Sequence, residues 1–220
     1  IVCNTIKFLL EKKVEVIIRS TVTEFGIDKI PEIVEFLLST FPGVKIHLEP
    51  VSECGRGLQT GQRFPSPELF IEGFKNAEKI ADVFGSEISY SGSSSNLTGF
   101  RQSFCGVSVP NFIVTPAGVV TACHEVAEKT HSLAENFIYG YLDTQDEKFV
   151  FDYDKIKRLK NYALKISPIC TECLALYYCA GECLAKRMES NEKINPRCKI
   201  NQELTRHYVL KKFFRKEVSK

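Results

Sequence analysis

Seven of the nine cysteines form one spacing pattern in the second half of the chain, and this pattern constrains the fold more than any other feature. Two of them enclose a glycine as C-x12-G-x4-C, four follow as C-x2-C-x5-C-x3-C, and one stands alone. Clustered thiolates of this kind bind metal. Seven ligands are too many for one four-thiolate site, so the pattern predicts two neighbouring metal centres, one of them short of a cysteine. In order, the seven are Cys105, Cys123, Cys170, Cys173, Cys179, Cys183 and Cys198.

The spacing also suggests which thiolates share a metal. In a C-x2-C knuckle such as Cys170 and Cys173, the two-residue spacer turns the backbone over the metal, so both sulfurs reach it. Cys179 extends this site by one loop, and Cys198 can return as a fourth ligand. Zinc and iron–sulfur clusters both accept four thiolates, so the spacing leaves both open.

Composition narrows the class of protein. The formal charge of +2 gives no argument for a nucleic-acid partner, and no run of about 18 apolar residues predicts a membrane-spanning helix. The chain shows no charged-then-apolar secretory leader. An odd number of cysteines then favours reduced thiolates over a disulfide scaffold. We therefore expect a cytoplasmic protein without a nucleic-acid or membrane partner.

Residues 1–49 alternate between helical and strand patterns. A helix over 5–13 is followed by a buried strand over 14–19, and a helix starting near Pro31 is followed by a strand over 44–48. This alternation predicts part of a parallel α/β sheet or barrel. Two parallel strands cannot close a barrel, so we expect the chain to be a fragment whose missing strands lie upstream of Ile1.

The pattern changes after a Ser/Gly-rich stretch. Two short strands, 111–115 and 119–123, are joined by a turn with Gly118, which predicts a β-hairpin. An amphipathic helix is expected over 151–166, and a last helix over 200–214. The predicted organisation is an α/β part over 1–85, a linker over 86–104, a cysteine-rich domain over 105–205, and a helix end with a basic tail over 206–220.

The cysteine series resembles the SPASM domain found at the C-terminus of many radical S-adenosylmethionine enzymes. All seven cysteines and Gly118 match, over roughly residues 100–205. The stretches VEVIIRSTVT and VKIHLEPV are similar to the last two core strands of the partial barrel that precedes SPASM in that family. The resemblance implies an α/β plus α+β fold: the last part of a partial (β/α) barrel, then a cysteine-rich SPASM domain with a β-hairpin and helices.

The resemblance implies two auxiliary iron–sulfur clusters, usually 4Fe–4S. Cys105, Cys123 and Cys183 would bind the first cluster. Some members of the family complete that cluster with a cysteine shortly before the position of Cys105, and this chain has none there. Either one iron stays open or another residue closes the cluster; Cys54 is the cysteine candidate, with an ordinary buried thiol as the alternative. The second cluster would be bound by Cys170, Cys173, Cys179 and Cys198.

The family's C-x3-C-x2-C loop is absent, so the residues that would start the reaction are not identified in this chain. The complete protein is expected to carry that loop with its own 4Fe–4S cluster, to bind S-adenosylmethionine, and to take electrons from a flavodoxin or ferredoxin. Arg19 and Glu49 end the two predicted strands. Each contacts the cofactor or a substrate, or else forms a salt bridge between elements.

The implied activity is modification of a peptide or protein substrate, with thioether or other crosslink formation in a ribosomal peptide as the preferred class. The alternative within the same chemistry is an anaerobic sulfatase-maturating enzyme that forms formylglycine; a complete first cluster would favour it. Two further alternatives are a non-catalytic zinc-binding interaction module and an electron-transfer protein that uses the two clusters alone.

Overall fold

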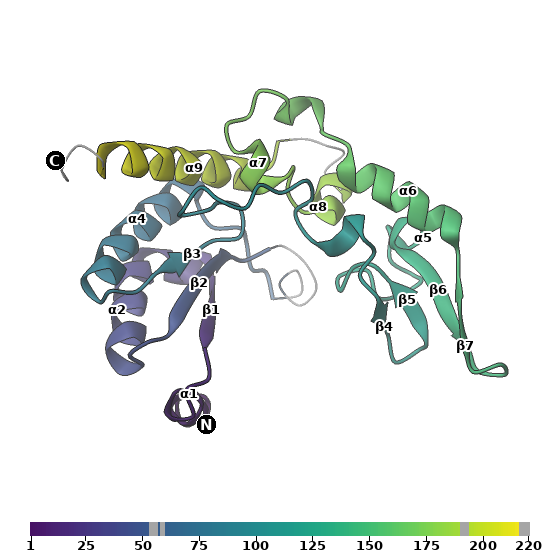
Figure 1. Ribbon diagram of the computed structural model, residues 1–220, viewed down its shortest axis with the longest axis horizontal. Helices are drawn as coiled ribbons and strands as arrows, with labels where there is room; N and C mark the ends of the chain where they lie inside the picture. The colour runs from purple at the N-terminus through teal and green to yellow at the C-terminus, as the bar shows by residue number, and fades with distance from the viewer. Residues whose placement is uncertain (53–56, 58–59, 190–193, 216–220) are drawn as a thin grey trace. The chain divides into compact units, whose positions relative to one another are not determined.

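The computed structural model describes residues 1–52, 57, 60–189 and 194–215 (Figure 1). The chain divides into two compact units. The first unit is Ile1–Thr98 together with the segment from Pro196 onward, and the second is Gly99–Asn195. Among the helices of the described residues, none combines the length and the apolar character needed to cross a membrane.

The first unit is built on a sheet of three parallel strands in the order β1, β2, β3. The predicted alternation of helix and strand over residues 1–49 is confirmed. Each of the two predicted strands begins within three residues of its predicted first residue. The elements are α1 (Val2–Glu11), β1 (Ile17–Val22), the 3-10 helix η1 (Glu24–Lys29), α2 (Ile30–Thr40), β2 (Lys45–Pro50), α4 (Pro67–Val83), β3 (Ile88–Ser89) and α9 (Pro196–Arg215).

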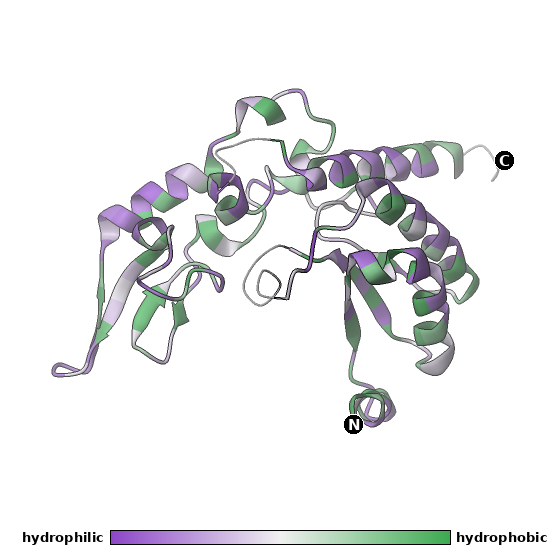
Figure 2. Cartoon of the chain, turned by 180° about the vertical axis from the view of Figure 1, so that it is seen from behind, coloured by the Kyte–Doolittle hydropathy of each residue, from purple (hydrophilic) through white to green (hydrophobic). Residues whose placement is uncertain are grey.

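Local sequence signals explain where α4 begins and which side it buries. The hydroxyl of Ser66 accepts a hydrogen bond from the Leu69 amide, and Pro67 occupies the first helical position. Phe70 and Phe74, four residues apart, are fully buried on one face. In Figure 2 the helices of this unit carry both hydrophilic and hydrophobic residues, as expected for helices that bury one side.

The two faces of the parallel sheet differ in chemistry. Ile46 and Leu48 of β2 are buried in a core that also contains side chains of α2, α4 and α9. The alternate residues face the other way. There Arg19, His47 and Ser89 occupy neighbouring register positions on the three strands. The sheet thus has one apolar face covered by helices and one polar face.

Residues 86–104 differ from the surface linker that their composition predicts. Ile88 and Ser89 form β3, which pairs with β2. Tyr90 is buried, and a Cβ on Gly92 would lie 2.0 Å from Oδ1 of Asn201 on α9. Small residues at the start of this stretch allow close packing against α9. Composition alone does not distinguish small residues that serve such packing from those of a surface loop.

The last helix starts earlier than predicted and belongs to the first unit. It begins at Pro196 instead of residue 200, and its Ile200 and Leu204 are fully buried in the first unit's core. The boundary expected at residue 205 therefore falls inside a continuous helix. Sequence order alone did not show that the chain returns to the first unit after the cysteine-rich region.

The second unit contains an antiparallel sheet in the order β4, β5, β6, β7. The predicted hairpin is present as β4 and β5, with Gly118 in a left-handed conformation (φ +74°) between them. The strands β6 and β7 were not predicted. The elements are η2 (Gly106–Ser108), β4 (Ile113–Val114), β5 (Val119–Thr121), α5 (Ala134–Phe137), β6 (Ile138–Asp143), β7 (Lys148–Phe151), α6 (Tyr153–Leu164), η3 (Pro168–Cys170), α7 (Leu176–Cys179) and α8 (Leu184–Glu189).

A separate apolar core holds the second unit together. Val120 of β5, Phe137 of α5 and Leu159 of α6 are almost fully buried in it. Cys123 and Cys183 pack against this same cluster as partly buried side chains. The core therefore holds in place the backbone segments that carry two of the predicted metal ligands, Cys123 and Cys183.

Candidate metal centres

The three cysteines assigned to the first cluster lie in one neighbourhood of the second unit. Cys105 precedes η2, Cys123 follows β5, and Cys183 comes directly before α8. Cys123 is close enough to both Cys105 and Cys183 for the charges of the thiolates to interact. The structure thus places Cys123 near each of two cysteines that are far from it in sequence. Within the described residues, no three His, Cys, Asp or Glu side chains are close enough together to hold a metal ion.

Main-chain amides near two of these sulfurs lower the pKa of the thiols. The amides of Glu125 and Val126 act in this way on Cys123, and those of Ala185 and Lys186 act on Cys183. Ala185 and Lys186 lie in the first turn of α8, where amides have no partner within the helix. Amide donors of this kind stabilise a thiolate and tune the potential of an iron–sulfur cluster.

Burial has the opposite effect to these amides on the pKa of the two thiols. It raises the pKa of Cys123, and it raises the pKa of Cys183 to about 11, with the nearby Glu125 and Cys123 adding to the rise. Both thiols are therefore protonated at neutral pH in the chain alone, and a metal would have to displace the protons. Soft sulfur ligands with amide donors at the edge of an apolar core fit a metal centre.

The second predicted site is built on a short, tightly turned loop. The Cys173 amide donates to the Cys170 carbonyl at 3.1 Å, which closes the turn of the C-x2-C knuckle. Cys179 is buried at the end of α7. Ala180 and Glu182, on either side of Gly181, have positive φ angles of 53° and 67°, a conformation that costs side-chain-bearing residues about 1–2 kcal/mol each.

The division between the two predicted cysteine sets falls at this turn. Cys179 is assigned to the second set, and Cys183, four residues later, is assigned to the first. Cys198 lies in the first turn of α9, within the other compact unit. The eight cysteines among the described residues form no disulfide. Cys54, the proposed extra ligand, lies outside the described residues.

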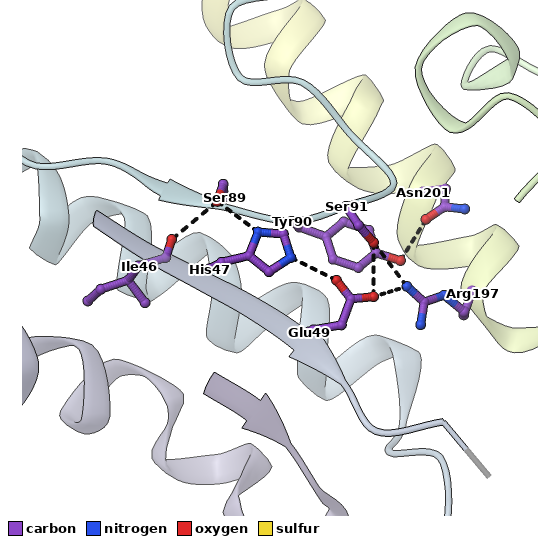
Figure 3. A network of polar contacts seen from close by, with 8 residues as sticks. All are labelled: Ile46, His47, Glu49, Ser89, Tyr90, Ser91, Arg197 and Asn201. Carbon is purple, nitrogen blue, oxygen red and sulfur yellow. Dashed lines mark hydrogen bonds and ion pairs between the residues drawn. The ribbon is translucent and has the colours of Figure 1, made fainter. Parts of the chain in front are cut away.

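Glu49, which ends β2, is the centre of a polar network on the first unit's sheet (Figure 3). One carboxylate oxygen accepts a hydrogen bond from the hydroxyl of Ser91 at 2.9 Å and pairs with the guanidinium of Arg197. The other oxygen lies 3.0 Å from Nε2 of His47. Both oxygens of Glu49 are therefore engaged by residues of the chain itself.

The network extends in two directions from Glu49. Nδ1 of His47 is 3.0 Å from the hydroxyl of Ser89, which also donates to the Ile46 carbonyl. On the other side, Arg197 lies over the ring of Tyr90 at 5.6 Å. The Tyr90 hydroxyl donates to Oδ1 of Asn201 at 2.7 Å. Arg197 and Asn201 are one turn apart on α9, so the network fastens the start of that helix to β2 and β3.

The electrostatics of Glu49 reflect these partners. Burial alone would raise its pKa, but the hydrogen bond with His47, the charge and hydrogen bond of Arg197, and the hydrogen bond from Ser91 outweigh it. The pKa of Glu49 falls from its usual 4.5 to about 2. The carboxylate is therefore charged at every pH at which the protein is expected to work.

Sequence reasoning identified Glu49 but not its partners. His47 and Glu49 are two residues apart on a strand, so their common face was readable from the sequence. Arg197 is 148 residues from Glu49, and no spacing signal links the two. Arg19 lies on the same polar face, opposite His47 in register, with an exposed side chain.

Comparisons with known proteins do not extend these assignments: no family model matches the chain, and a search of the curated proteins found no similar sequence.

Proposed function

We propose that the chain is the C-terminal part of a radical S-adenosylmethionine enzyme of the SPASM type that modifies a peptide or protein. The observation that carries this proposal is the seven-cysteine spacing, which matches the family's pattern throughout. The closeness of Cys123 to both Cys105 and Cys183 supports it, because the proposed ligand set requires these residues to share one neighbourhood.

In this proposal Cys105, Cys123 and Cys183 hold one auxiliary cluster, and Cys170, Cys173, Cys179 and Cys198 hold the other. Such clusters supply electron transfer to or from a reacting substrate. The chain's own contribution is to present the thiolates and to place main-chain amides near two of them. The apolar packing around Cys123 and Cys183 limits water around the sulfurs.

Glu49 and Arg197 have a positioning role in the same scheme. Arg197 directly precedes Cys198 in the first turn of α9 and is held by the carboxylate at the end of β2. The pair therefore fixes the backbone of a proposed cluster ligand. If Glu49 contacted the cofactor instead, that contact would have to compete with its three hydrogen-bond partners. The side chain of Arg19, by contrast, is exposed on the polar face.

Peptide crosslinking is the preferred reaction class, because no cysteine precedes Cys105 closely enough to complete the first cluster. An iron that lacks a protein ligand is suited to hold a substrate thiolate. A flavodoxin or ferredoxin would be the electron donor. Sulfatase maturation stays the alternative within the same chemistry.

The coding sequence upstream of Ile1 provides the test. We expect an in-frame C-x3-C-x2-C motif there. A chain extended to include it should cleave S-adenosylmethionine under reducing, anaerobic conditions, whereas the same chain with those three cysteines changed to alanine should not. A start codon at Ile1, or an upstream region without the motif, would contradict the proposal.

A further inference from the structure

A cavity of about 330 Å³ lies in the second unit, beside the loop that carries Cys170, Cys173 and Cys179. Its walls come from the end of α6, from α7 and the turn after it, and from α8, and Figure 1 shows these helices. None of the polar groups of the Glu49 network belongs to it. The cavity is thus separate from the site on the first unit.

Three cationic side chains line this cavity: Arg101, Lys165 and Arg187. Among the described residues that line it, there is no aspartate or glutamate. Arg101 is half-buried, and its main-chain amide donates to the Tyr177 carbonyl at 2.9 Å, which holds it beside α7. Lys165 is exposed at the end of α6. The lining is therefore positively charged.

Arg187 is the most firmly placed of the three cations. It is only 8% exposed, and its Nη2 donates to the Tyr162 carbonyl at 2.9 Å. A Cβ on Gly181 would lie 2.8 Å from its Nη1, so glycine at residue 181 leaves room for the guanidinium at this position. A buried charge is costly unless its surroundings compensate it. The fold thus maintains a fixed positive charge at the wall of the cavity.

The remainder of the lining is largely apolar, with Ile166, Leu176 and the ring of Tyr177 among its members. Guanidinium groups form paired hydrogen bonds with carboxylates, and an apolar wall favours a carboxylate attached to a hydrocarbon group. The volume is near the lower end of the 300–1,000 Å³ typical of small-ligand sites, roughly enough for one or two amino-acid residues.

We propose that this cavity binds a carboxylate carried on an apolar group, such as the C-terminal end of a peptide. Arg101, Lys165 and Arg187 neutralise the carboxylate, while Leu176 and Ile166 contact its hydrocarbon part. Carboxylate binding does not depend on the metal centres. Its interpretation as recognition of the peptide to be modified rests on the proposed function.

To test the proposal, the metal content of the 220-residue chain is first measured. The chain is then titrated with N-acetyl-leucine and with N-acetyl-leucinamide, and binding is measured by calorimetry or ligand-observed NMR. We expect the acid to bind at least about tenfold more tightly than the amide, because only the acid pairs with the cations. The double variant Arg101→Gln/Lys165→Gln should lose about tenfold in affinity for the acid. Both residues are at least partly exposed, so the variant should fold.

Lys160→Gln is the control: it removes one positive charge, against two in the double variant, from an exposed position of α6 that does not line the cavity. It should bind the acid as the unchanged chain does. A third probe, N-acetyl-glutamyl-leucinamide, carries its carboxylate on a side chain. Its affinity relative to that of N-acetyl-leucine shows whether the cavity recognises the carboxylate of a peptide terminus or that of an acidic residue.

Three outcomes would overturn the proposal: no binding of any carboxylate probe, equal binding of N-acetyl-leucine and its amide, or an equal loss of affinity in Lys160→Gln and the double variant. Each is distinct from failure of the proposed function. A chain without iron but with carboxylate binding refutes only the enzyme class, and an iron-containing chain without carboxylate binding refutes only the cavity's role.

Discussion

Replacing Glu49 with glutamine is expected to lower the free energy of unfolding of the first unit by about 3 kcal/mol at pH 7. Glutamine keeps the shape of the side chain but removes the negative charge that compensates the largely buried guanidinium of Arg197. The fall in the pKa of Glu49 from 4.5 to about 2 corresponds to the same stabilisation, about 3 kcal/mol. Urea unfolding followed by circular dichroism measures it.

The pH dependence of this difference provides an independent check. The pKa of Glu49 is depressed in the folded chain, so its stabilising contribution is complete above the unfolded value of 4.5. It is lost as the pH falls through the folded value of about 2. The unchanged chain and Glu49→Gln should therefore differ fully at pH 7, less below pH 4.5, and hardly at all near pH 2.

Glu68→Gln is the matched control for Glu49→Gln. Glu68 also pairs with a cation of α9, Lys199, but both side chains are more than half exposed, and exposed ion pairs contribute little to stability. We expect unfolding curves that overlap those of the unchanged chain. If Glu49→Gln behaved like Glu68→Gln, the network of Figure 3 would not fasten α9 to the sheet.

Changing Cys123 or Cys183 to alanine is expected to remove about half of the iron bound by the anaerobically purified chain, because each change should abolish one of two clusters. Cys123 packs against the core of the second unit and is close to both other members of its set. Losing one of only three protein ligands leaves two, too few to retain the cluster. Iron and sulfide analysis of each variant measures the loss.

Cys3→Ala is the control for these variants. Cys3 is exposed on α1, outside the cysteine pattern, and its replacement should leave the iron content unchanged. The double variant Cys170→Ala/Cys173→Ala, which leaves two ligands at the second site, should also lose about half of the iron, but from the other cluster. The variants with Cys123 and Cys170 changed should then differ in their electron paramagnetic resonance spectra. Identical spectra, or equal losses in Cys3→Ala, would contradict the division of the cysteines into two sets.

The elements with strong local signals were predictable from the sequence. Ser66 and Pro67 marked the start of α4, and Gly118 marked the turn between β4 and β5. β3 was missed because only two of its residues pair, within a stretch whose Ser and Gly content is typical of loops. β6 and β7 pair through residues such as Tyr141 and Val150. Neither strand alternates between buried and exposed residues, so the two lack the period-2 pattern that predicts a strand, although aromatic and β-branched residues favour one.

The candidate sites also differ in how far the sequence alone predicts them. Cysteine spacing carries information about metal binding because ligands of one centre recur at short, regular separations, and Cys170, Cys173 and Cys179 show this clearly. The pairing of Glu49 with Arg197 depends on how α9 packs on the sheet, and no local rule encodes it. The cationic cavity also arises only from tertiary structure, because Arg101 and Arg187 meet there from distant parts of the chain.

The central claim is that the chain holds iron–sulfur clusters through its seven patterned cysteines, and metal analysis of the anaerobically purified chain tests it most directly. We predict a brown protein containing iron and acid-labile sulfide in about equal amounts, roughly four of each per cluster. A colourless protein with stoichiometric zinc and no sulfide would contradict the claim and would identify the cysteine sets as structural zinc sites.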